Sequence, residues 1–174
     1  MLTFSNGLKF AAVASVLMFA GCTEKPKPAA QEEAPPAPMA SAPSETQSSV
    51  VAGSVQDFRV NVGDTVHFDY DKYNVKDEDR GLLQRQAAWL QKYPQVRVTV
   101  EGHCDERGTR EFNLALGARR ANAVKEYLVS LGVTSARVDT ISYGKEKPMC
   151  TESDESCYAQ NRRGVTTITS GATS

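Results

Sequence analysis

Val98–Leu128 reads VTVEGHCDERGTREFNLALGARRANAVKEYL, a strand pattern followed by a polar loop and then a long helix. The valines in Val96–Val100 alternate with polar residues, which is the period of a half-buried strand. The helix is expected over about Arg110–Leu131, and Gly132 is expected to form its C-cap. Its predicted core stripe consists of Leu114, Ala118, Ala121, Val124, Leu128 and Leu131.

Similar patterns predict the rest of the domain on both sides of this stretch. We expect strands at Thr65–Asp69, Arg137–Tyr143 and Gly164–Thr169, and helices at Asp77–Tyr93 and Glu155–Gln160. The order of these elements favours a sheet whose apolar face is covered by helices. The sequence therefore predicts an α+β fold, a two-layer sandwich in which a mixed sheet of about four strands packs under two long helices and one short helix.

The first residues have the pattern of an export signal that ends in a lipid anchor. Lys9 supplies positive charge, and the apolar run Phe10–Phe19 is too short to cross a hydrocarbon core of about 30 Å. Ala20 and Gly21 then precede Cys22, a combination that resembles the lipobox of bacterial lipoproteins. We expect residues 1–21 to be removed as a signal peptide and Cys22 to be acylated. An ordinary cleaved signal with an incidental cysteine is the alternative.

The segment after the cysteine bears on location and on domain organisation. Thr23 stands where an aspartate would oppose sorting to the outer membrane, so we expect an outer-membrane lipid anchor with the domain facing the periplasm. Residues 22–56 are rich in Pro, Ala, Ser, Glu and Gln, which bury too little apolar surface to fold, and we expect a disordered tether there. The folded domain is expected over residues 57–170, with a tail at 171–174.

The polar run Glu101–Thr109 is the densest concentration of chemistry-bearing residues in the chain. Gly102 and Gly108 bracket it, as expected where a backbone turns tightly or approaches a ligand. Asp105 in this loop and Arg120 on the following helix are suited to hold the ammonium and the carboxylate of a zwitterionic amino-acid end. From the residues alone, an Asp–Arg pair that merely closes the loop onto the helix stays open as the alternative.

The same stretch resembles the signature of the OmpA-like peptidoglycan-binding domains, and within that family it is most similar to the peptidoglycan-associated lipoproteins. Supporting matches are VHFDYDKY at Val66–Tyr73, ISYGKEKP at Ile141–Pro148 and NRRG at Asn161–Gly164. The resemblance therefore covers nearly all of the predicted domain. It implies an α+β sandwich that binds the diaminopimelate of peptidoglycan stem peptides without covalent chemistry.

Carried over position by position, the resemblance assigns roles to particular side chains. Asp105 is expected to contact the ammonium of diaminopimelate, and Arg120 its carboxylate. The positions expected to line the same groove are Tyr70, Asp71, Arg107, Asn113 and Leu116. The neighbouring residues expected to have structural or surface roles are Asp69, Arg119, Arg162 and Arg163.

The resemblance also implies a cellular role. The chain is expected to fasten the outer membrane to the cell wall and to act with TolB and the other Tol proteins in envelope integrity and cell division. TolB is expected to contact a surface that overlaps the wall-binding one. A lipoprotein that mainly docks protein partners is the alternative. A net charge of −1 gives no basic field for nucleic acid, which is not an expected partner.

Enzymatic chemistry is not expected, nor is a cofactor. Asp105 and Glu106 are adjacent on a loop, whereas the two carboxyl groups of a glycosidase must face one bond across about 5–10 Å. A metal site is not expected either, because His103, Cys104, Cys150 and Cys157 do not have the spacing of zinc ligands. Cys150 and Cys157 flank a short loop in a compartment expected to be oxidising, so we predict a disulfide between them, with Cys104 as the odd thiol.

Overall fold

The structure is a computed structural model, and it describes residues 50–174. The predicted signal peptide, the acylation site at Cys22 and most of the predicted tether lie outside the described residues. Within residues 50–174, no helix is both long enough and apolar enough to cross a lipid bilayer.

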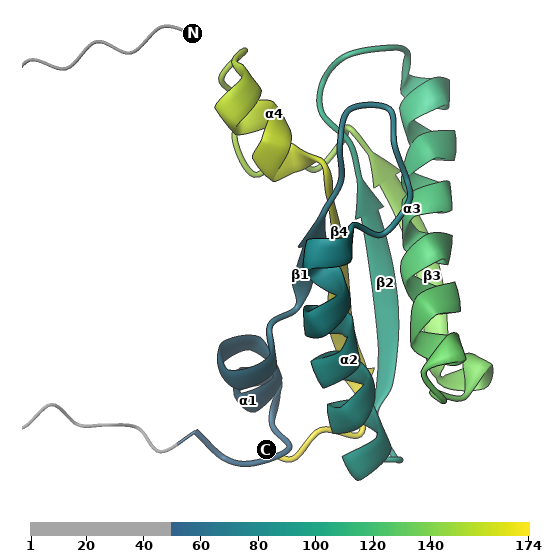
Figure 1. Cartoon of the computed structure of the whole chain (residues 1–174). Coiled ribbons are helices and arrows are strands. Elements are labelled where there is room, and N and C mark those ends of the chain that lie inside the picture. The colour runs from purple at the N-terminus through teal and green to yellow at the C-terminus, as the bar shows by residue number, and fades with distance from the viewer. Residues whose placement is uncertain (1–49) are drawn as a thin grey trace, which may run out of the picture. The chain divides into compact units, whose positions relative to one another are not determined.

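Four strands form one mixed sheet (Figure 1). They are β1 (Thr65–His67), β2 (Arg97–His103), β3 (Val138–Gly144) and β4 (Arg163–Ser170), in the order β1-β4-β2-β3. The last strand, β4, runs antiparallel to both of its neighbours, whereas β2 and β3 are parallel. The polypeptide between β2 and β3 must therefore cross over, and the long helix predicted there makes that connection.

Helices cover one face of this sheet. They are α2 (Asp77–Lys92) and α3 (Arg110–Ser130), and the short α4 (Glu155–Asn161) lies at the end of the sheet where β4 begins (Figure 1). Leu83 and Leu90 of α2 pack with Val98 and Val100 of β2 in one buried core. The predicted α+β sandwich is therefore confirmed.

The N-terminal part of the domain contains structure that the sequence patterns did not predict. A short helix, α1 (Val55–Asp57), continues into one turn of π-helix, η1 (Phe58–Val62). Phe58 is buried against the ring of Trp89 at 4.9 Å between centroids, and the Trp89 Nε1–H donates to Asp57 Oδ2 at 2.8 Å. Contacts with a residue distant in sequence stabilise these turns, so local periodicity carries no signal for them.

The ends of several elements also differ from the expectation. Ser54 forms a bridge with Thr173, so ordered structure extends beyond the expected limits at residues 57 and 170. The first strand ends at His67, because the chain turns at Asp69, whose carbonyl accepts from the Lys72 N–H. A turn of 3₁₀-helix, η2 (Ser135–Arg137), delays the start of β3.

The buried face of α3 agrees with the predicted stripe at Ala121, Val124 and Leu128 but differs from it in the first turns of the helix. Leu114 is 47% exposed, so its assignment to the core stripe is wrong. The buried positions are Asn113, Leu116, Gly117, Arg120, Ala121, Val124 and Leu128. The face is rotated because the first turns of α3 cover a polar pocket and not the apolar core. Gly132 has a φ of 96° just after the helix, in agreement with its predicted capping role.

Two glycines bring α3 unusually close to β2. A Cβ atom on Gly102 would overlap the carbonyl oxygen of Gly117, and one on Gly117 would overlap the Ser142 hydroxyl. Only glycine fits at both positions of this crossing. The crossing lies directly before the polar loop, so it fixes the distance between that loop and the first turns of α3.

Candidate functional site

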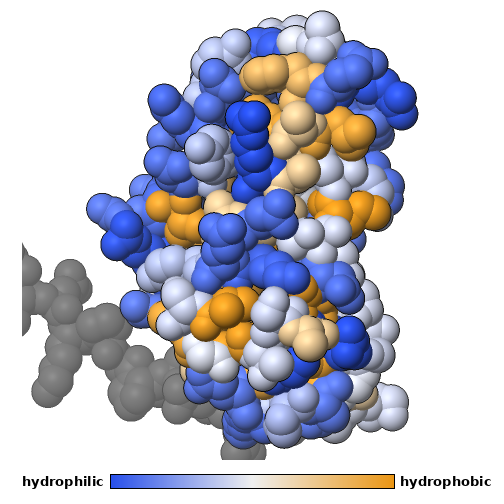
Figure 2. Space-filling view, turned by 90° about the vertical axis from the view of Figure 1, so that its right-hand side faces the viewer, coloured by the Kyte–Doolittle hydropathy of each residue, from blue (hydrophilic) through white to orange (hydrophobic). Residues whose placement is uncertain are grey.

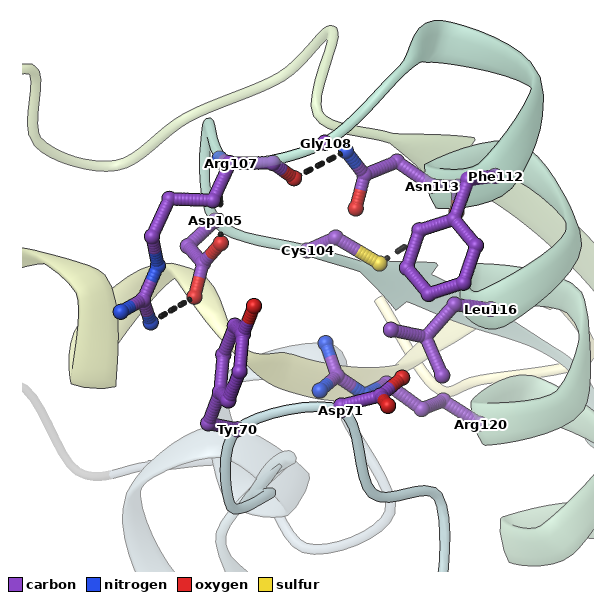
Figure 3. A pocket seen from close by; sticks show the side chains of 10 residues that line it. All are labelled: Tyr70, Asp71, Cys104, Asp105, Arg107, Gly108, Phe112, Asn113, Leu116 and Arg120. Carbon is purple, nitrogen blue, oxygen red and sulfur yellow. Dashed lines mark hydrogen bonds and ion pairs between the residues drawn. The ribbon is translucent and has the colours of Figure 1, made fainter.

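A pocket opens where β1 and β2 end and α3 begins (Figure 3). The cavity has a volume of about 40 Å³, which suits the end group of a ligand more than a whole peptide. Its lining is Tyr70, Asp71, Cys104, Asp105, Arg107, Gly108, Phe112, Asn113, Leu116 and Arg120. The fold therefore brings together the seven side chains predicted to form a groove: Tyr70 and Asp71 come from the segment after β1, and the other five come from the continuous stretch 105–120.

Asp105 is a buried carboxylate that already has cationic partners. Its residue is 4% exposed, and its Oδ2 atom lies 2.6 Å from Arg107 Nη2 and 3.4 Å from Arg162 Nη1. Its Oδ1 atom accepts from the Arg107 backbone N–H at 3.2 Å. Burial by itself raises the pKa of Asp105, but the hydrogen bonds and charges of the two arginines outweigh burial and hold that pKa below its usual value. Asp105 is therefore ionised at neutral pH.

Arg120 is a fully buried guanidinium that has only main-chain partners. It is 0% exposed, and its Nε, Nη1 and Nη2 atoms donate to the carbonyls of Lys72, His103 and Asp69 at 2.8, 2.8 and 3.1 Å. Burial lowers its pKa from the usual value for arginine. Among residues 50–174, no carboxylate forms an ion pair with it. A buried positive charge without a counter-ion is costly, so the pocket favours an anion beside Arg120.

The alternative of a direct Asp105–Arg120 pair does not describe this geometry. Asp105 borders the pocket from the loop after β2, and Arg120 borders it from α3 (Figure 3). Asp105 bonds to an arginine, however, and Arg120 bonds to main-chain carbonyls. Arg120 does hold loop to helix, but through the His103 carbonyl. The carboxylate and the guanidinium are thus separate poles of one cavity.

The remaining walls are shaped by hydrogen bonds and by one unusual backbone angle. Asp71 has a φ of 54°, the only positive φ at a non-glycine residue in the described part of the chain, and such local strain is common at binding sites. Asn113 is buried and donates to the carbonyls of Arg107 and Thr109 at 2.7 and 3.1 Å, so it holds the loop in shape. Leu116 and the half-exposed Phe112 provide an apolar wall.

Arg107 lies between two aromatic rings at the rim. Its guanidinium carbon is 4.2 Å from the centroid of Tyr70 and 4.4 Å from that of Tyr158. Its Nη1 atom is 3.6 Å from Glu155 Oε2. Cation–π contacts on both faces restrict the guanidinium to the plane between the rings, from which it reaches both Asp105 and Glu155.

Three further residues support the site: Arg162, for which a structural role was expected, and Glu155 and Tyr158, which were not identified from the sequence. Arg162, expected to have a structural or surface role, is buried and bonded to both Asp105 and Glu155, with Nη2 2.6 Å from Glu155 Oε1. Glu155 and Tyr158, both on α4, hold Arg107 as described above. The pair Arg162–Arg163 directly before a strand was a possible signal for Arg162, since buried arginines usually have partners. Nothing in the sequence links α4 to the polar loop.

The other neighbours have the supporting positions expected of them. The carboxylate of Asp69 is 70% exposed, while its carbonyl accepts from Arg120. Arg119 is exposed, with its guanidinium 5.9 Å from the Tyr73 ring. Arg163 is buried and donates to the carbonyls of Asn161 and Lys147 at 3.4 and 3.2 Å.

The histidine and cysteines near the loop are structural. A disulfide joins Cys150 to Cys157, which removes both thiols from any ligand set. Cys104 is buried, and burial raises the pKa of its thiol to about 11, so it is protonated and unreactive. Burial and the nearby Arg163 lower the pKa of His103 to about 4, so its ring is neutral. Within residues 50–174, His, Cys, Asp and Glu side chains do not cluster as a metal site requires.

Asp105 and Glu106 point to different partners. The carboxylate of Glu106 accepts from Ser153 Oγ and Tyr158 Oη, each at 2.8 Å, beside the disulfide loop. Asp105 faces Arg107 and Arg162 instead. The two carboxylates are therefore not directed at one bond, as glycosidic cleavage would require.

Comparisons with known proteins agree with the fold and the motif. Residues 67–162 match the OmpA family. The chain is 57% identical over 120 residues to the peptidoglycan-associated lipoprotein of Agrobacterium fabrum, covering 69% of this chain and 68% of that protein. It is 59% identical over 116 residues to the peptidoglycan-associated lipoprotein of Rhizobium meliloti, covering 67% and 66%.

Solved structures give the same picture. The crystal structure of the peptidoglycan-associated lipoprotein from Burkholderia pseudomallei superposes with a TM-score of 0.60 at 45% identity, covering 61% of this chain and 90% of that one. The C-terminal domain of Helicobacter pylori MotB has a TM-score of 0.58 at 23% identity, over 62% and 84% of the two chains, and shows a shared fold alone. The resemblance noted in the sequence is confirmed, and the chain belongs to the OmpA family.

Proposed function

We propose that this chain binds peptidoglycan non-covalently by holding the free end of diaminopimelate in the pocket between Asp105 and Arg120. The observation that carries the proposal is a fully buried Arg120 guanidinium without a carboxylate partner, in the same small cavity as an ionised Asp105. The carboxylate of a zwitterionic end group supplies the counter-ion that Arg120 lacks, and its ammonium lies toward the ionised Asp105. Lipoproteins more than half identical to this chain are named for their association with peptidoglycan, which supports the same ligand.

The chemistry of each pole suggests the orientation of the ligand. Arg120 uses one N–H at each nitrogen for a main-chain carbonyl, and a guanidinium has five N–H groups, so donor capacity remains for a ligand carboxylate. The ligand ammonium then lies toward Asp105. Phe112 and Leu116 offer an apolar wall for the methylene groups between the stem peptide and the charged end.

We also propose that the chain is anchored in the outer membrane. Residues 1–21 act as a signal peptide, acyl chains on Cys22 hold the protein in the membrane, and the segment between Cys22 and the folded domain connects the anchor to the domain. In this position the domain connects two layers of the envelope and joins the Tol system through TolB. Asp105 and Glu106 have separate partners, which supports binding without hydrolysis of the glycan.

A second candidate function is the docking of envelope proteins. The exposed apolar side chains Phe112, Leu114, Val129 and Ile141 of α3 and β3 are compatible with a protein contact. Figure 2 shows the side of the domain that carries α3, where apolar patches are separated by hydrophilic side chains. No continuous apolar face is visible there, so wall binding is the better-supported function of the two.

Co-sedimentation of the full-length chain with purified sacculi tests the proposal. Synthetic stem peptides act as competitors: one with meso-diaminopimelate, one with lysine, which lacks the distal carboxylate, and one with 2-aminopimelate, which lacks the distal amine. We expect the diaminopimelate peptide to displace the protein at the lowest concentration and the lysine peptide to fail. Equal competition by all three peptides, or no sedimentation with sacculi, would contradict the proposed site.

A further inference from the structure

Arg107 occupies the position that a ligand cation would need. Its Nη2 atom lies 2.6 Å from Asp105 Oδ2, which is the separation expected for a strong charge-assisted hydrogen bond. With the contacts from Arg162 and the Arg107 backbone N–H, three of the roughly four acceptor positions of the carboxylate are in use. The negative charge of Asp105 is therefore already neutralised by the protein itself.

Of the two arginines on Asp105, Arg107 is the one that is free to leave. The Arg162 side chain is 8% exposed and bonds to the Phe68 carbonyl at 3.0 Å and to Glu155 at 2.6 Å, so it is held on three sides. The Arg107 side chain is 34% exposed, and its Nε atom is buried without a hydrogen-bond partner. Its present position thus leaves one donor unsatisfied, which lowers the cost of moving it.

Glu155 provides a second carboxylate close to the Arg107 guanidinium. Glu155 Oε2 is 3.6 Å from Nη1, on the side of the guanidinium away from the Asp105 contact. The guanidinium carbon lies 4.2 and 4.4 Å from the ring centroids of Tyr70 and Tyr158, and a cation–π contact extends to about 6 Å, so a small shift leaves both contacts in range. A small displacement exchanges the Asp105 contact for a closer Glu155 contact, and the positive charge keeps a carboxylate partner throughout.

We propose that Arg107 is an internal occupant of the ammonium subsite, which an incoming ligand ammonium displaces toward Glu155 between the rings of Tyr70 and Tyr158. This inference rests on the proposed function, since it concerns the amine half of the same pocket. Its consequence is selectivity: a ligand end without a positive charge cannot replace the guanidinium on Asp105. Arg107 and Glu155 therefore determine which amines are accepted, while Arg120 holds the carboxylate.

Arg107→Met tests the exchange, because methionine fills the space between the rings without competing for Asp105. The dissociation constants of the full-length chain in detergent solution are measured for the diaminopimelate and 2-aminopimelate stem peptides. We expect the variant to bind the diaminopimelate peptide about two- to fivefold more tightly than the wild type, the range of one partly exposed ion pair. The 2-aminopimelate peptide should bind no more tightly. Equal weakening for both peptides would overturn the proposal and make Arg107 a structural residue.

Glu155→Gln tests the receiving position. We expect about two- to fivefold weaker binding of the diaminopimelate peptide, and a smaller effect of Glu155→Gln in an Arg107→Met background, where only the Arg162 contact of Glu155 is left to lose. Glu152→Gln is the matched control, since it removes one charge from the same segment and Glu152 forms no ion pair in the described part of the chain. An undiminished effect of Glu155→Gln in the double variant would overturn the exchange.

NMR spectroscopy of the wild-type protein tests the same exchange without any substitution, so it remains informative if a variant misfolds. The Nε–Hε NMR signal of Arg107 should shift on addition of the diaminopimelate peptide and stay unchanged with the 2-aminopimelate peptide. A signal that responds to neither peptide, while both bind, would refute the displacement of Arg107 but leave the pocket assignment intact. Failure of wild-type chain to bind either peptide would refute the proposed function instead.

Discussion

Two arginines at opposite ends of the sheet have nearly the same hydrogen bonds but different surroundings. Arg120 donates to the carbonyls of Lys72, His103 and Asp69. Arg137 donates to the carbonyls of Val96, Leu90 and Tyr93 at 2.8 to 2.9 Å. Burial lowers the pKa of both guanidinium groups. A count of main-chain bonds therefore does not separate a binding residue from a structural one.

The surroundings make the difference. Leu90 and Tyr93 lie at the end of α2, so Arg137 satisfies carbonyls at the negative end of a helix, and this is a capping role. Arg120 instead borders a cavity that also contains an ionised carboxylate. A buried cation with an empty space beside it and an opposite charge across that space indicates binding.

Arg120→Ala should weaken binding to sacculi by about 2–5 kcal/mol, because the ligand carboxylate loses its buried partner. Co-sedimentation of the full-length variant measures the loss. Arg119→Ala is the matched control, since Arg119 is the adjacent exposed arginine on the same helix. If the two variants sediment alike while both remain folded, Arg120 has only a structural role, as Arg137 does.

His103 should make the pocket end sensitive to acid. Its pKa is lowered to about 4 by burial, so the folded state excludes a proton that the unfolded state binds below about pH 6.5. Its contribution to stability is complete above that pH and is lost as the pH falls toward 4, amounting to about 3 kcal/mol. Urea unfolding across this range should show a smaller pH dependence for His103→Leu than for the wild type. Identical pH dependence would assign the acid sensitivity to other groups.

Arg137→Ala should lower the free energy of unfolding by about 1–3 kcal/mol, because carbonyls at the end of α2 lose their donor. Urea denaturation measures the change. Sedimentation with sacculi should remain at the wild-type level at temperatures where the variant is folded. A specific loss of binding without a loss of stability would remove the distinction between the two ends.

Thr109→Ala should have the smallest effect, about 1 kcal/mol of stability, since the Thr109 hydroxyl accepts from the Phe112 N–H at 3.2 Å as the N-cap of α3. Thr109→Ser keeps the cap and serves as its control. Thermal unfolding distinguishes the two. Equal stability of the alanine and serine variants would mean that the Gly102–Gly117 crossing alone positions the start of α3.

Local patterns in the sequence predicted most of the fold. The strand alternation before Gly102 and the boundaries of α2 and α3 agree with the structure, because solvent exposure imposes periods of two and 3.6 residues on such elements. The core stripe predicted for α3 was wrong at Leu114, because it was drawn from apolar residues alone. Periodicity identifies apolar residues, and here the buried face begins with Asn113, Leu116 and Arg120.

Only part of the candidate site could be predicted from the sequence. The motif around Asp105 and Arg120 named the two poles of the pocket, and a resemblance over the whole domain added the lining residues Tyr70 and Asp71. The side chains that hold Asp105 and Arg107 come from α4 and from Arg162 directly after it, about fifty residues later in the chain. Their contacts depend on how β4 lies between β1 and β2, and no local pattern records that order.

The sequence by itself determined the types of the main elements, the polar loop and the cysteine pair, because each depends on residues close together in the chain. Tertiary structure alone decided that Arg120 lacks a carboxylate partner and that Arg107 already forms an ion pair with Asp105. The physical reason is that charge compensation in a buried pocket depends on distances across the fold. Whether a charge is satisfied by the protein or left for a ligand is settled only when those distant segments meet.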